Sequence, residues 1–415
     1  MDVVGGMELT INTVWLMTAT TLIFFMQLGF AFLEGGSVRS KNTVNVVMKN
    51  FVDMCFGALF FWFVGYGLMF GTNPTGWFGT DHFILSSGVD WDFSLLLFQM
   101  MFAATAATIV SGAMAERIRF WPYLVISVLV TIGVYSVFGS WVWGSYYGET
   151  QGWLRKLGFI DFAGATVVHS IGGWCAMAGI LVLGPRLGRF AQDGTARTIP
   201  GHNLPLVAAG GFILWVGWFG FNGGSALEAG ANLGRILLNT HLSGSAGVVG
   251  AILLMGLLRR PVLMTTTVNG GLAGLVASTG GCATMSAPFA VLTGLVAGAI
   301  LVLGLAVFDG LGLDDPVGAV SVHAFNGVWG TVAAGLFVSG DLFNLEQVTV
   351  QLIGVVAAFL WAFPISWVIF RGVDLLIPLR ASTMHEQRGL DFTEHYEMGY
   401  PEFQQDILHG GKEDV

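Results

Sequence analysis

The sequence DFAGATVVHSIGGW, residues Asp161–Trp174, places an aspartate and a histidine eight positions apart at the start of a long apolar segment. A second stretch, DPVGAVSVHAFNGVW at Asp315–Trp329, repeats the aspartate, the Gly-Ala and Val-His pairs, and a glycine four residues after the histidine. Ionisable side chains are costly within a bilayer, and those found there face the protein interior or a pathway. The repeat therefore indicates two related halves and two candidate functional histidines, His169 and His323.

The composition is that of a membrane protein. The chain has 415 residues, of which 54% are hydrophobic and only 10% are charged, and its mean hydropathy is +0.73. Soluble domains carry roughly a quarter charged residues. The formal net charge of -9 lies mainly in loops and in the tail, so it gives no reason to expect a nucleic-acid partner.

Eleven apolar segments are long enough to cross a bilayer, which takes about 20 residues of helix. The acidic start, MDVVGGMELT, lacks the basic region of a signal peptide, so we expect the first segment to be retained. The predicted spans are residues 11–33, 44–70, 94–115, 120–143, 161–183, 204–225, 241–258, 262–280, 286–307, 318–338 and 348–370.

The positive charges predict the orientation of these spans. Of the 17 Lys and Arg, 13 lie in alternate connections or in the tail from Arg371, and only Arg155, Lys156 and Arg235 fall clearly on the other side. The positive-inside rule then predicts an outer N-terminus and a cytoplasmic C-terminus. We expect an all-α integral membrane domain over residues 1–371 and a cytoplasmic tail over residues 372–415.

The two motif copies lie in predicted spans five and ten, so helices 1–5 and 6–10 form an inverted repeat. Each histidine follows its aspartate by eight residues, which is about 12 Å into a core of about 30 Å, from opposite faces. The two imidazoles are therefore expected to meet near the centre. A neutral imidazole has one donor and one acceptor, which suits a proton relay as well as a structural contact between helices.

The two aspartates, Asp161 and Asp315, stand where a carboxylate caps the first N–H groups of a helix. We expect this structural role for both, although Asp161 at the outer face also attracts cations. The neighbouring Asp314 is interpreted as part of a cytoplasmic loop.

Aromatic residues gather where several spans should reach the outer face. Trp143 ends span four, Phe102 lies near the start of span three, and Phe221 near the end of span six is followed by Ser225. Ring faces bind a cation that has lost water, and a hydroxyl adds a directional contact. The alternative is that these rings are interfacial anchors, as most aromatic residues at a membrane boundary are.

The chain resembles ammonium transporters of the Amt/Mep/Rh type. The resemblance rests on stretches that run in order through nearly the whole chain: FAFLEGGSVRSKNTVNVVMKN, GAMAERIRF, DFAGATVVHSIGGW, LVLGPRLGRF, HNLP, GWFGFNGGS, NGGLAGLV, DDPVGAVSVH and RGLDFTEHYEMGY. It implies an eleven-helix inverted repeat in the cell membrane, a homotrimer with one pore per subunit, and ammonium or methylammonium as the substrate.

The resemblance also implies roles for individual residues. Trp143, Phe102 and Ser225 would recruit ammonium on the outer side, where Asp161 supports the vestibule. Phe102 and Phe221 would form the gate, and His169 and His323 would be the paired pore histidines. Ammonium would give up its proton, cross as ammonia, and be reprotonated inside, whereas potassium has no proton to give up.

Two features depart from the family pattern. Phe325 and Asn326 follow the second histidine, where the family usually has small residues, and a phenylalanine there could narrow the pore. The tail continues past Tyr400 with PEFQQDILHGGKEDV, which resembles the linker of a fused ammonium sensor; a short native extension or a cloning remnant would look the same.

These features are compatible with three functions. A transporter is favoured, and the alternative is a receptor that binds ammonium and signals through its cytoplasmic tail with little conduction. An enzyme is not expected, because the chain has no zinc-ligand spacing, nucleophile motif or phosphate loop, and we expect neither metal nor cofactor. The family resemblance makes the tail a docking region for a PII-type regulator and an ordered segment over residues 385–400.

Overall fold

The computed structural model describes residues 3–144 and 146–403, and the regular structure in this part of the chain is helical throughout. The first half contains α1 (Val3–Ser37), η1 (Ser40–Asn42), α2 (Thr43–Phe60), η2 (Phe61–Gly65), α3 (Tyr66–Phe70), α4 (Asp90–Ala113), α5 (Phe120–Leu129), η3 (Val130–Tyr135), α6 (Ser136–Trp143), α7 (Trp153–Lys156), η4 (Ala165–Ser170) and α8 (Ile171–Leu183). The remainder contains α9 (Leu204–Gly224), α10 (Leu233–Leu257), α11 (Met264–Ser278), α12 (Ala287–Gly310), η5 (Val320–Phe325), α13 (Asn326–Leu336), α14 (Leu345–Leu376), α15 (Thr383–Arg388), α16 (Leu390–His395) and η6 (Pro401–Phe403).

Within the described residues, nine helical stretches are long and apolar enough to cross a membrane, and each coincides with a predicted span. The other two predictions, residues 262–280 and 318–338, fall on α11 and on η5 with α13. Helix α11 has only 15 residues, which is about 22 Å of helix, less than the apolar thickness of a bilayer. The chain is thus an all-helical, multi-pass membrane protein.

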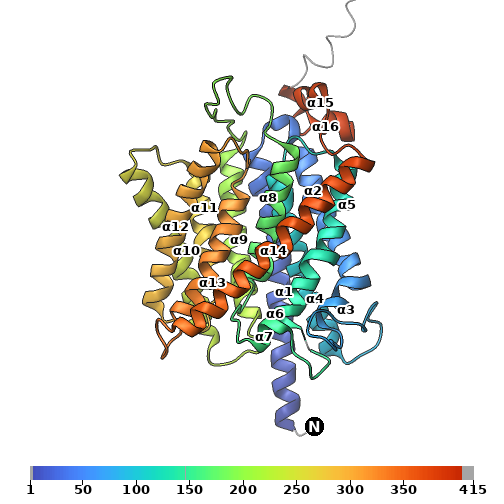
Figure 1. The fold of residues 1–415 in the computed structure, drawn as a ribbon, viewed down its shortest axis with the longest axis vertical. Coiled ribbons are helices and arrows are strands. Elements are labelled where there is room, and N and C mark those ends of the chain that lie inside the picture. Colours follow the sequence, from blue (N-terminus) through green and yellow to red (C-terminus); the bar gives the residue numbers. More distant parts are fainter. Residues whose placement is uncertain (1–2, 145, 404–415) are drawn as a thin grey trace, which may run out of the picture.

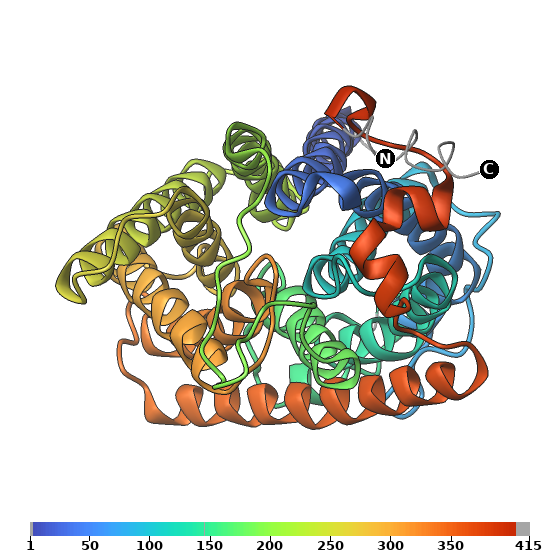
Figure 2. The same ribbon diagram turned by 90° about the horizontal axis from the view of Figure 1, so that it is seen from above.

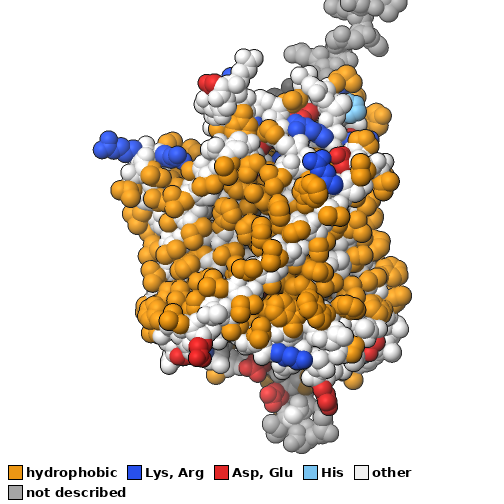
Figure 3. Space-filling model, viewed as in Figure 1, with side chains coloured by type: hydrophobic (Ala, Val, Ile, Leu, Met, Phe, Trp, Pro, Cys, Tyr) orange, Lys and Arg blue, Asp and Glu red, His pale blue; other side chains and the backbone are white. Residues whose placement is uncertain are grey.

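The surface agrees with this placement. Hydrophobic side chains cover the middle of the molecule as a continuous band, and most of the visible Lys and Arg lie above it (Figure 3). Large apolar residues within the spans are exposed, such as Phe212 at 74%, Leu253 at 63% and Val368 at 62%. An apolar face of this extent is stable only against lipid or another protein surface.

Helix α14 lies obliquely along one side of the bundle and reaches across both halves of the chain (Figures 1 and 2). Its buried Gln351 donates from Nε2 to the carbonyl of Ile160 at 2.6 Å and to that of Thr331 at 2.9 Å. Further along, Trp361 donates to the carbonyl of Val134 at 3.0 Å. Helix α14 therefore joins the segments that carry both motif copies.

Glycines allow the closest helix contacts, as is common in membrane bundles. Helix α1 packs along α9, where a Cβ on Gly210 would lie 2.5 Å from the backbone nitrogen of Leu33. A Cβ on Gly220 would lie 2.5 Å from the carbonyl oxygen of Ala19. Side chains at these two positions would force the helices apart.

Four short segments, η2, η3, η4 and η5, are π-helical turns, a form that is often found at functional sites. His169 lies in η4 and His323 lies in η5. Both segments follow a glycine with positive φ, Gly164 at 104° and Gly318 at 76°. The repeated sequence therefore forms the same local structure twice.

Candidate functional site

The structure brings the two motif histidines into contact in the interior of the bundle. The Nδ1 atoms of His169 and His323 are 3.2 Å apart, and the ring centroids are 5.2 Å apart with an interplanar angle of 19°. His169 is fully buried and His323 is 5% exposed. Because a neutral imidazole carries one N–H, one ring donates to the other, and a proton can move between them.

The motif aspartates position the segments that carry the histidines. The carboxylate of Asp161 accepts hydrogen bonds from four backbone N–H groups, those of residues 164–167, at 2.7–3.0 Å. Asp315 accepts from the backbone N–H groups of Ala319 and Val320 at 3.0 and 2.8 Å. Both aspartates thus have the helix-capping role that the sequence predicts, since the first N–H groups of a helix have no intrahelical acceptor.

Two glycines let the histidine-bearing segments approach. A Cβ on Gly173, in α8, would lie 2.4 Å from the backbone nitrogen of Ala324. A Cβ on Gly327, in α13, would lie 2.3 Å from the carbonyl oxygen of Ala165. These are the glycines four residues after each histidine, so the repeated motif includes the contact that brings the imidazoles together.

A stack of aromatic rings covers one side of the histidine pair. Phe102 and Phe221 are stacked with centroids 4.1 Å apart and an interplanar angle of 26°, and Phe221 lies 5.5 Å from the ring of His169. Trp218 stacks on His169 at 5.4 Å and 20°. Trp218 was not singled out from the sequence, although it lies three residues before Phe221 and so on the same face of α9.

Beyond the stacked rings lies a cavity of about 320 Å³, lined by Trp143 at the end of α6. We call it the far cavity, because α6 and α7 lie at the end of the bundle away from α15 and α16 (Figure 1). Its lining includes three of the predicted recruitment residues, Trp143, Phe102 and Ser225. Trp143 meets Phe102 edge to face at 6.0 Å. The full lining is Phe70, Leu95, Phe98, Gln99, Phe102, Trp143, Tyr146, Arg155, Phe162, Ser225 and Leu227.

Asp161, the fourth predicted recruitment residue, is not among the residues that line the far cavity. The Asp161 side chain is 5% exposed, and its carboxylate is engaged by the backbone of η4. Its carbonyl oxygen accepts a hydrogen bond from the indole N–H of Trp143 at 2.8 Å. Asp161 therefore holds a wall of the far cavity and contributes negative charge behind it.

On the other side of the histidines are two further spaces. A small cavity of about 20 Å³ is lined by Phe30, Leu33, Glu34, Ile109, Asn269, Leu272, Val317, Ala319, Val322 and His323. Asn269 and Val317 also line a larger space of about 300 Å³, the tail-side vestibule, together with Ser37, Arg186, Arg189 and Asp315. The far cavity, the ring stack, the histidine pair, the small cavity and the vestibule thus follow one another.

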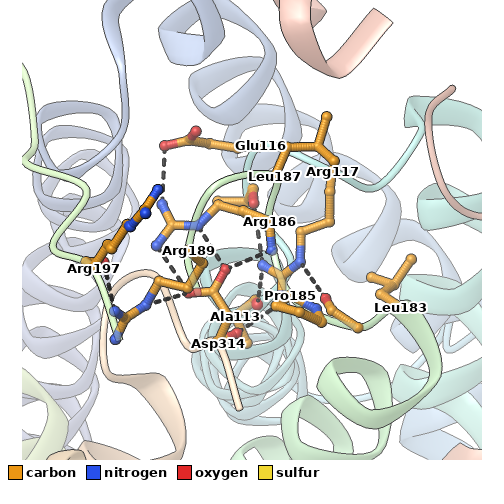
Figure 4. A network of polar contacts seen from close by, with 12 residues as sticks. Ala113, Glu116, Arg117, Leu183, Pro185, Arg186, Leu187, Arg189, Arg197 and Asp314 are labelled. Atoms are coloured by element: carbon orange, nitrogen blue, oxygen red, sulfur yellow. Dashed lines mark hydrogen bonds and ion pairs between the residues drawn. The ribbon is translucent and has the colours of Figure 1, made fainter. Parts of the chain in front are cut away.

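Asp314 lies in the loop between α12 and η5, as the sequence predicts, but the sequence did not predict its burial. Asp314 is 1% exposed and lies at the centre of an ionic network (Figure 4), where Arg186 Nε donates to Oδ2 at 2.8 Å and Arg189 Nε lies 3.3 Å from Oδ1. Burial alone would raise the pKa of Asp314, but the hydrogen bonds and charge of Arg186 outweigh burial and lower the pKa to about 2. The network fixes the wall of the tail-side vestibule.

The tail segment over residues 385–400 is folded onto the bundle, as the sequence predicts. Asp391 accepts from the backbone N–H of Asn45 at 2.8 Å, and the backbone N–H of Leu390 donates to Asn42 at 2.9 Å. Glu386 accepts from Arg380 at 2.9 Å. The predicted extension after Tyr400 lies mostly in residues 404–415, outside the described part of the chain.

Phe325 and Asn326 are not among the residues that line the small cavity. The ring of Phe325 packs 6.0 Å from Trp174 and 6.1 Å from Phe308. Asn326 is buried and donates to the carbonyl of Ser321 at 2.8 Å. These contacts give no support to a narrowing of the pore by Phe325.

Comparison with known proteins identifies the class to which this fold and site belong. The model of the Ammonium Transporter Family matches residues 14–400, so the chain belongs to the ammonium transporter family, whose members are channels and transporters, not enzymes.

Individual relatives cover nearly the whole chain. The ammonium transporter Amt2 of Archaeoglobus fulgidus is 42% identical over 95% of this chain and 89% of its own length. A solved structure described as a sensor Amt protein matches with a TM-score of 0.90 and 37% identity, over 94% of this chain and 100% of that one. Mep2 of Candida albicans matches with a TM-score of 0.82 and 27% identity, over 90% of this chain and 87% of that one.

Proposed function

We propose that this protein carries ammonium across the membrane through the series of spaces described above. The observation that supports the proposal is the order of those spaces around one buried histidine pair. The curated relatives are ammonium transporters, and the match to a sensor protein does not favour a receptor over a transporter. A methylated ammonium ion is a second substrate of the same charge and similar shape.

In the proposed mechanism, ammonium enters the far cavity, where the faces of Trp143 and Phe102 and the hydroxyl of Ser225 replace part of its water shell. The stacked rings of Phe102 and Phe221 must turn aside for it to advance, which makes them the gate. Past this gate the path is apolar and a full charge is costly. Ammonium therefore releases a proton to the histidine pair and continues as ammonia, a route closed to potassium.

The arrangement in the membrane is part of the same proposal. We place the N-terminus outside and the end with α15 and α16 in the cytoplasm, since most of the Lys and Arg visible in Figure 3 lie at that end. We count α11 and the η5–α13 pair as two further spans, shortened by turns at their ends, which makes eleven. Residues 1–371 would form the membrane domain and residues 372–415 the cytoplasmic tail, with a homotrimer as the assembly and the tail as the docking region for a PII-type regulator.

A current measurement tests the function. Purified protein in liposomes on a solid-supported membrane is expected to give a current on an ammonium pulse, a smaller one with methylammonium, and none with potassium. Empty liposomes are the control. Binding of ammonium in calorimetry without any current would support the receptor and contradict the transporter.

Replacement of Phe325 tests the prediction that this ring narrows the pore. Because the ring packs between Trp174 and Phe308, Phe325→Val is expected to leave the ammonium current unchanged and to cost about 2 kcal/mol of stability through lost packing. The current and the thermal unfolding temperature are measured on the same preparation. A current that rises well above that of the unmodified protein would place the ring in the pathway.

A further inference from the structure

Three charged side chains that the mechanism above does not use are buried between α1, α2, α4 and α5. Glu34 is 2% exposed, and Lys49 and Asp53 are fully buried. The ammonium group of Lys49 and the Oδ1 atom of Asp53 have no hydrogen-bond partner among the described residues, although Asp53 Oδ2 accepts from the hydroxyl of Tyr123. Incompletely paired charges are costly to bury, so this cluster is not explained by folding stability.

Glu34 connects the cluster to the pathway. Its side chain lines the same small cavity as His323, and that cavity, at about 20 Å³, has room for one molecule the size of water or ammonia. Oε2 of Glu34 accepts from the amide of Asn50 at 2.9 Å, which fixes the carboxyl group in place. A Cβ on Gly112 would lie 2.9 Å from Oε1, so the glycine of α4 leaves room for the carboxyl group.

The other charges of the cluster face Glu34 from α2. Lys49 and Asp53 both act electrostatically on the Glu34 carboxyl group, and the ammonium group of Lys49 lies 5.3 Å from the ring centre of Tyr123. The cluster therefore contains one amine and two carboxyl groups, and the charges of Lys49 and Asp53 both act on a proton held by Glu34.

We propose that Glu34 is the proton-returning residue of the pathway and the binding site for the ammonium that re-forms beyond the histidines. This inference rests on the proposed function. In the step, ammonia in the small cavity takes the proton of the Glu34 carboxylic acid: an N–H bond forms, the O–H bond breaks, and ammonium and carboxylate are left as an ion pair. The carboxylate regains the proton that ammonium released on the far side, passed on by His169 and His323.

The net result is one ammonium transferred for each cycle, with no other reactant. The carboxylate also explains why ammonium can form at this depth, because an opposite charge in contact offsets the cost of a cation in an apolar setting. From the small cavity the ion leaves through the vestibule, past Asn269 and Val317, which line both spaces.

Glu34→Gln tests the proposal, because glutamine keeps the shape and the hydrogen bond to Asn50 but cannot return a proton. The ammonium current of proteoliposomes is expected to fall at least about tenfold, and its dependence on the pH of the tail-side solution is expected to disappear. Glu34→Asp, which keeps a carboxyl group, is expected to retain part of the current and the pH dependence. The matched control is Glu386→Gln, a buried glutamate of α15 that lies outside the pathway.

The outcomes separate this inference from the proposed function. If the unmodified protein carries current and Glu34→Gln carries the same current with the same pH dependence, Glu34 is structural and the inference is wrong. If the unmodified protein carries no ammonium current, the proposed function fails and the inference fails with it. If Glu34→Gln does not fold, Glu34→Asp is compared with the unmodified protein instead. A Glu34→Asp current equal to that of the unmodified protein at every tail-side pH would overturn the proposal.

Discussion

The ammonium current of proteoliposomes is expected to fall by about 100-fold when His169 is replaced by alanine. The Nδ1 atoms of His169 and His323 are 3.2 Å apart, and no other pair of imidazoles in the described residues is recorded in contact. Without His169, the proton of ammonium has no acceptor next to the stacked rings of Phe102 and Phe221. Ammonium must then cross an apolar segment as an ion, which is the same barrier that excludes potassium.

A second histidine provides the control for this experiment. His241 lies in α10, is exposed, and accepts a hydrogen bond from Trp215 at 3.2 Å, away from the pathway. His241→Ala removes the same side chain from a transmembrane helix and should leave the current unchanged. Equal currents from His169→Ala and the unmodified protein would show that the histidine pair takes no part in conduction.

The largest effect on stability is expected at Asp314. Removal of its carboxylate by Asp314→Ala leaves Arg186 buried with one ionic partner fewer, and breaking a buried ion pair in this way costs about 3 to 5 kcal/mol. Unfolding of the detergent-solubilised protein, followed by tryptophan fluorescence during heating or in denaturant, measures the loss. The tail-side vestibule should also lose its shape, because Arg186 and Arg189 line it.

The pH dependence of stability follows from the same residue. The folded-state pKa of Asp314 is lowered to about 2, below the value of about 3.9 in an unfolded chain. Its contribution to stability is therefore complete above pH 4 or so and is lost as the pH falls toward 2. Asp314→Asn should remove this part of the acid sensitivity.

Asp309 is the matched control for Asp314. It also pairs with an arginine, Arg189, but its side chain is 48% exposed, and exposed pairs contribute about 0 to 1 kcal/mol. The unfolding temperature of Asp309→Ala should lie within a few degrees of that of the unmodified protein. An equally small shift of the unfolding temperature in Asp314→Ala would contradict the structural role of the buried network.

Local sequence patterns predicted much of the site. The repeated Asp–His motif predicted both helix caps and the meeting of two imidazoles, because the capping geometry and the rise of a helix are set within a few residues. The prediction that residues 385–400 form an ordered segment came from the family resemblance. The helix caps and the histidine contact depend on short stretches whose structure is the same in both halves.

Features that depend on distant residues were missed. The loop position of Asp314 was predicted, but its burial depends on Arg186, which follows α8 and is far away in the sequence. The stacking of Trp218 on His169 likewise joins two distant segments of the chain. The π-helical turns have no sequence signature comparable to a cap. The predicted spans 262–280 and 318–338 are longer than α11 and the η5–α13 pair, because apolar residues continue into the turns at their ends.

Helix α14 has a consequence for how the pathway works. Through Gln351 and Trp361 it is bonded to the backbone at Ile160, Thr331 and Val134, so it spans the boundary between the two motif copies. A rocking movement of one half against the other would break these bonds. In the proposed mechanism the passage therefore opens through rotation of individual rings, and no rearrangement of the two halves is needed.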